Sequence, residues 1–131
     1  MAEGFFDCNH AGSLAHVPRY IISFNDGDMN FPEEDFPAVR DAVTKIRLEG
    51  KAAGIWKFAA GLHTQDVKTV YADGTVKDSS LQPGVPHLGG FTVVEVENIE
   101  EAYKWAQKIA VGCRCPQEVK ELIYAPHEDQ E

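Results

Sequence analysis

Residues 91–112, FTVVEVENIEEAYKWAQKIAVG, predict a strand followed directly by a helix. The first six residues are mostly apolar and β-branched over the length of a buried strand. Asn98, with Glu101 three residues later, resembles a capping box, and Gly112 provides a helix end. The apolar residues of this helix recur at helical spacing: Ala102, Trp105, Ala106 and Ile109. We therefore expect one βα unit here.

The same order of strand and helix occurs once more, nearer the start of the chain. Residues 20–24 are apolar and β-branched, and from Phe36 apolar side chains recur at spacings of three and four until Gly50. Further strands are predicted over residues 55–62 and 118–124. Each helix is thus followed by a second strand, which gives two βαβ units.

A hairpin is predicted between these two units. Residues 67–77 contain Asp73-Gly74, which supplies the positive φ of a tight turn. Residues 78–90 contain two prolines and three glycines and predict an irregular loop. Two βαβ units with an inserted β-hairpin predict an α+β fold, the ferredoxin-like sandwich, in which both helices cover one face of an antiparallel sheet.

The other face of that sheet has no predicted cover. Trp56, Phe58 and Val93 are available to it. Together they would expose more apolar surface than a monomer of this size tolerates. We therefore expect a homodimer whose sheets pack together.

The chain length of 131 residues fits one domain. We divide it into an N-terminal extension (1–19), a folded domain (20–125) and an acidic tail (126–131). No apolar run approaches the roughly 20 residues of a membrane helix, and Met1-Ala2-Glu3 lacks the basic residues of a secretory signal. Three cysteines, an odd number, are a poor basis for disulfides, so we expect a cytoplasmic protein.

The charge balance excludes several classes of partner. Twelve Lys and Arg residues against 21 Asp and Glu residues give a net charge of −9. This excess of negative charge works against binding to nucleic acid or to an anionic membrane. The sequence contains no P-loop, dinucleotide-binding motif or serine-hydrolase motif, so no cofactor is expected.

Several short motifs follow one another along the chain: Asp78, the Gly89-Gly90 pair, the strand over 91–96, and the helix carrying Glu101-Ala102 and Trp105-Ala106. Together they resemble the YCII-related, or DGPF-domain, family. The resemblance covers about residues 20–124. It implies a ferredoxin-like fold that dimerises as an α+β barrel, with a cleft containing the signature aspartate. Most of the family has no known function, and some members are associated with small-molecule turnover, for which a His–Asp pair is proposed.

The sequence departs from the family pattern at three places. Ser79-Ser80-Leu81 stands where the family has Gly-Pro-Phe, and Val85-Pro86 replaces its Lys-Glu step. No histidine occurs between Phe31 and Ile55, where the first helix of members with the His–Asp pair carries one. The family's own pair is therefore not carried over to this chain.

The resemblance places Asp78 at a strand end that faces the cleft. Partial burial there would raise its pKa toward the range of a general base. His63 and His87 lie on the flanking loops, and an imidazole beside a carboxylate can transfer protons near neutral pH. The alternatives are an aspartate that caps its loop and two solvent-exposed loop histidines.

The loop after Asp78 supplies the predicted ligand-binding residues. Ser79 and Ser80 can orient a ligand oxygen, and Gly89 and Gly90 end the same loop. The alternative role for adjacent loop serines is to satisfy local backbone groups.

Three functions remain open from the sequence. The first is a YCII-like homodimer that binds a small polar or aromatic metabolite and carries out cofactor-independent proton transfer, with Asp78 as base and a histidine as its partner. The second is a non-catalytic ligand-binding or regulatory module that uses the same cleft. The third is a metal site, which we do not expect, because paired cysteine ligands are normally separated by two or more residues. Its candidate ligands would be Cys8, His10, His16, Cys113 and Cys115, the last two of which are otherwise exposed loop thiols.

Overall fold

The computed structural model describes residues 16–63 and 67–124. The predicted N-terminal extension and acidic tail therefore fall largely or wholly outside the described residues. The elements are β1 (Arg19–Asn25), the short 3-10 helix η2 (Glu33–Asp35), α2 (Phe36–Ala52), β2 (Trp56–Gly61), β3 (Thr69–Val70), β4 (Val76–Lys77), β5 (Leu88–Glu95), α3 (Ile99–Cys113) and β6 (Glu118–Glu121). No helix in the described part of the chain has both the length and the apolar character that a membrane span needs.

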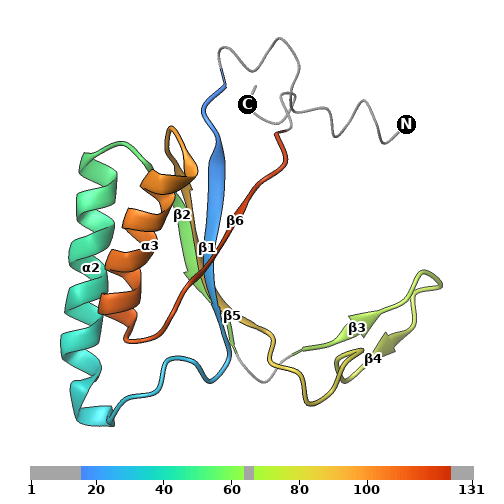
Figure 1. Cartoon of the computed structure of the whole chain (residues 1–131). Coiled ribbons are helices and arrows are strands. Elements are labelled where there is room, and N and C mark those ends of the chain that lie inside the picture. Colours follow the sequence, from blue (N-terminus) through green and yellow to red (C-terminus); the bar gives the residue numbers. More distant parts are fainter. Residues whose placement is uncertain (1–15, 64–66, 125–131) are drawn as a thin grey trace.

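Two layers make up the body of the molecule. Strands β2, β5, β1 and β6 form an antiparallel sheet in that order, and α2 and α3 lie side by side on one of its faces (Figure 1). Within residues 16–63 and 67–124, strands β3 and β4 pair only with each other, as a small hairpin that extends away from this body (Figure 1). The predicted α+β class is confirmed, and the arrangement is consistent with a ferredoxin-like βαββαβ order.

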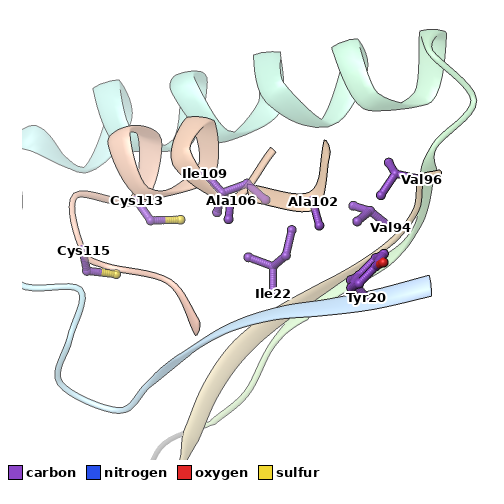
Figure 2. Packing of buried hydrophobic residues seen from close by; sticks show 9 residues of the cluster. All are labelled: Tyr20, Ile22, Val94, Val96, Ala102, Ala106, Ile109, Cys113 and Cys115. Carbon is purple, nitrogen blue, oxygen red and sulfur yellow. The ribbon is translucent and has the colours of Figure 1, made fainter. Parts of the chain in front are cut away.

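The core lies between α3 and the two central strands. Side chains alternate along a strand, so Tyr20 and Ile22 of β1 share the helix-facing side with Val94 of β5. Figure 2 shows Ile22 and Val94 opposite the small and apolar face of α3. That face consists of Ala102, Ala106, Ile109 and Cys113, and the core also includes Val96 and Cys115.

The start of β5 differs from the prediction. Gly89 and Gly90 were expected in an irregular loop, but both are buried strand residues. A Cβ at Gly89 would lie 3.0 Å from the backbone of Asn25, and one at Gly90 would lie 2.5 Å from Cζ of Phe24. These glycines therefore allow a neighbouring strand and an aromatic ring to approach closely, which makes them packing positions.

The end of α3 also differs from the prediction. Gly112 does not end the helix; the helix continues to Cys113, and Arg114 adopts the left-handed conformation, with φ of 62°, as the C-cap. A Cβ on Gly112 would lie 2.7 Å from Cδ1 of Ile46, so this glycine allows α2 and α3 to pack closely. Nη1 of Arg114 lies 2.7 Å from Oδ2 of Asp35, at the start of α2.

Asn98 caps α3 as predicted: its Oδ1 accepts a hydrogen bond from the backbone N–H of Glu101 over 3.0 Å. We expect Asn98→Ala to lower the free energy of unfolding by about 1 kcal/mol, because a helix N–H group loses its acceptor. Urea titration followed by circular dichroism measures this change. Glu97→Ala, at the adjacent exposed position, is the control, and equal stability of the two variants would contradict the capping role.

Candidate functional site

Asp78 is exposed at the end of the hairpin. Its side chain is 85 % exposed and forms an ion pair with Nζ of Lys68 on the same hairpin. This hydrogen bond, together with the charge of Lys68, holds the pKa of Asp78 below its usual range. Within the single chain the carboxylate is thus neither buried nor raised in pKa, because the hairpin extends away from the body of the molecule (Figure 1).

The two serines form hydrogen bonds with neighbouring residues. The carbonyl of Ser79 accepts a hydrogen bond from Oγ1 of Thr69 over 2.7 Å. Oγ of Ser80 accepts one from the backbone N–H of Gln82 over 2.8 Å. The contact of the Ser80 hydroxyl agrees with the alternative in which loop serines satisfy local backbone groups, whereas the Ser79 contact involves its main-chain carbonyl.

The two histidines differ in burial. His63 follows β2 and is exposed, whereas His87 is partly buried and its carbonyl accepts a hydrogen bond from the backbone N–H of Asp26 over 2.7 Å. His87 and Ser80 line an open groove beside Lys68 at the base of the hairpin; His63 does not line it. This groove thus brings two predicted site residues, Ser80 and His87, close to Lys68, the ion-pair partner of Asp78. Their catalytic role stays a prediction.

A second hollow, which we call the inner cavity, lies between the helices and the sheet and is partly open to solvent. It measures about 260 Å³, and most of its wall is apolar. Phe24, Trp56 and Ala59 contribute from the sheet, and Val43 and Ile46 contribute from α2. No pattern in the sequence predicts this cavity.

Small residues explain why the inner cavity exists. Ala59 pairs with Thr92, which is buried on the helix side, so Ala59 faces the same side. A Cβ on Gly61 would meet no atom within 4 Å, whereas the space above neighbouring Gly90 is filled by the ring of Phe24. The cavity therefore lies where β2 carries alanine and glycine in place of larger side chains.

Trp56 forms one wall of the inner cavity, contrary to its predicted place on the uncovered sheet face. A Cβ on Gly50 would lie 2.7 Å from Cε3 of Trp56, so the indole rests directly on α2. The cause is a register shift between Trp56 and Phe58: Trp56 pairs with Val94 on the helix side, and Phe58 pairs with Val93 on the other.

Four polar side chains also line the inner cavity: Arg47, Thr92, Cys113 and Gln117. Nε2 of Gln117 lies 3.3 Å from the carbonyl oxygen of Cys115 and donates to it. Burial raises the pKa of the Cys113 thiol to about 11, so the thiol is protonated near neutral pH. It is therefore a poor nucleophile.

Both described cysteines were expected to be exposed, and both are buried, because α3 extends to Cys113 and Cys115 packs against the core. Burial, together with the charge of Asp28, raises the pKa of Cys115 as well. Residues 16–63 and 67–124 contain no group of three potential metal ligands. Cys8 and His10 lie outside the described residues, so the metal alternative stays untested.

The sheet face opposite the helices carries apolar side chains. Phe58 is 60 % exposed, and its ring centroid lies 5.8 Å from that of Phe91. Ile21 and Val93, which pair with each other across β1 and β5, flank these rings. Away from this face, the hairpin and the loop that follows it carry further exposed apolar residues: Val70, Tyr71, Val76 and Leu81.

Comparison with known sequences does not assign this chain to a family. No protein-family model matches the chain, and a search of curated proteins found no similar sequence. The resemblance to the YCII-related family accordingly stays a prediction.

Proposed function

We propose that this chain is a homodimeric, non-catalytic domain that binds a small molecule in the inner cavity. The observation that carries the proposal is the cavity itself, whose walls are apolar apart from four polar side chains. Binding sites for small molecules typically have this composition, because apolar walls supply affinity and a few polar groups fix orientation. A cavity of roughly 150 Å³ holds benzene, so about 260 Å³ accommodates one ring with a substituent.

Binding is favoured over acid–base catalysis by the groups available. Asp78 is exposed, and its ion pair with Lys68 keeps it a weak base. No histidine or carboxylate among the described residues lines the inner cavity, and its thiol is protonated near neutral pH. The cavity thus offers recognition groups but no group suited to move a proton.

The uncovered sheet face supports the homodimer. Phe58, Phe91 and the Ile21–Val93 pair form a continuous apolar area that a second copy of the same face would cover. Two sheets joined in this way would form the α+β barrel implied by the family resemblance. An isolated two-stranded hairpin is marginally stable in water, so contact with a second copy would also stabilise the β3–β4 hairpin.

A cavity-filling substitution tests the binding proposal. We expect toluene to raise the melting temperature of the parent protein by several degrees, because a ligand that binds only the folded state stabilises it. Ala59→Leu places a larger side chain in the inner cavity and should abolish this shift. Differential scanning calorimetry measures both effects.

Ala53→Leu is the matched control, because Ala53 is exposed at the C-cap of α2 and the same volume is added outside the cavity. This variant should keep the full shift with toluene. An undiminished shift in Ala59→Leu would show that toluene binds elsewhere and would contradict the proposal.

A further inference from the structure

Arg47 is distinctive among the cations of this chain. Its side chain lines the inner cavity and is partly buried. Within residues 16–63 and 67–124, it forms no ion pair, and every other lysine or arginine without one is exposed. An arginine on the wall of an apolar cavity, with no carboxylate partner among the described residues, can bind an anion that enters the cavity, because charge-assisted hydrogen bonds are strong.

We propose that the inner cavity selects small ring-bearing carboxylates and that Arg47 binds the carboxylate group. This inference rests on the proposed binding function and assigns its ligand class. The planar guanidinium can donate two parallel hydrogen bonds to a carboxylate, while Trp56 and Phe24 contact the ring. The hydroxyl of Thr92 is a further donor on the cavity wall.

The charge of the site favours a monoanion over a phosphate. Arg47 is the one lysine or arginine among the described residues that line the inner cavity. The chain as a whole carries a net charge of −9, which disfavours multiply charged anions. One guanidinium balances one carboxylate, whereas a phosphate dianion would keep an unbalanced charge in an apolar site.

Two ligands that differ in charge and little in shape test the inference: phenylacetate and phenylacetamide. Trp56 lines the cavity, so its fluorescence reports binding once Trp105→Phe removes the other indole. In this background, phenylacetate should bind about tenfold or more tightly than phenylacetamide, because charged hydrogen bonds exceed neutral ones.

Arg47→Gln should lower the affinity for phenylacetate by about the same tenfold factor and leave the affinity for phenylacetamide unchanged. Arg47→Lys keeps the charge but loses the paired donors, so it should retain an intermediate affinity. Lys45→Gln, an exposed cation on the same helix, is the control and should change neither affinity. Circular dichroism and the melting temperature of each variant establish that it is folded.

The possible results separate the two proposals. Equal affinity for both ligands, or no effect of Arg47→Gln on phenylacetate, would overturn the carboxylate inference and leave the cavity proposal standing. Binding of neither ligand, combined with no toluene effect, would overturn the cavity proposal and the inference with it.

Discussion

Phe58→Asp should convert the protein from a dimer to a monomer. Phe58 is 60 % exposed on the uncovered sheet face, and its ring contacts that of Phe91. In a sheet-to-sheet dimer this position becomes buried, where an unpaired carboxylate costs several kcal/mol and so lowers affinity by orders of magnitude. Sedimentation velocity at micromolar concentration distinguishes the two states.

The matched control for this experiment is Val111→Asp. Val111 is 75 % exposed on α3, in the layer on the opposite side of the sheet, so a charge there should leave the dimer intact. A parent protein that sediments as a monomer would contradict the dimer proposal. A Phe58→Asp variant that dimerises as tightly as the parent would show that the interface lies on another surface.

Ile22→Ala should lower the free energy of unfolding by about 2–5 kcal/mol. Ile22 has no exposed surface and lies at the centre of the core with Val94, facing α3 (Figure 2). The loss combines the transfer free energy of the removed carbons with the cost of the cavity they leave. Urea denaturation measures it.

Leu48→Ala is the control for the core substitution, since Leu48 is 57 % exposed on α2 and its loss should change stability by only about 0.5 kcal/mol. Both proteins should be measured at several concentrations, because the proposed dimer would make the apparent stability depend on concentration. A cost below about 1 kcal/mol for Ile22→Ala would contradict the central place of this residue in the core.

Most elements of the fold could be predicted because their signals are local. The apolar spacing from Phe36 onward and the Asn98 cap gave both helices, and the Asp73-Gly74 turn gave the hairpin. The start of β5 was missed, because a glycine pair predicts a loop. The contact of Gly90 with the ring of Phe24 becomes visible only in the folded structure. The side on which Trp56 lies was also missed, since a register shift in β2 reverses the ordinary alternation.

The candidate site was harder to predict from the sequence because it depends on distances between elements. The environment of Asp78 depends on where the hairpin points, and no sequence pattern specifies this. The inner cavity arises where side chains are small, as at Ala59 and Gly61. Small residues in a strand are a weak signal that fits close packing equally well. The partly buried state of Arg47 appears only once the strands beside α2 are in place.

The most direct test of ligand binding in the inner cavity is the position of a bound ligand. Nuclear Overhauser effects should connect the ring protons of phenylacetate to the methyl groups of Ala59, Val43 and Ile46, which line the inner cavity. Contacts confined to Val70 and Leu81, which line the groove at the hairpin, would contradict the account, because they would place the ligand at the hairpin.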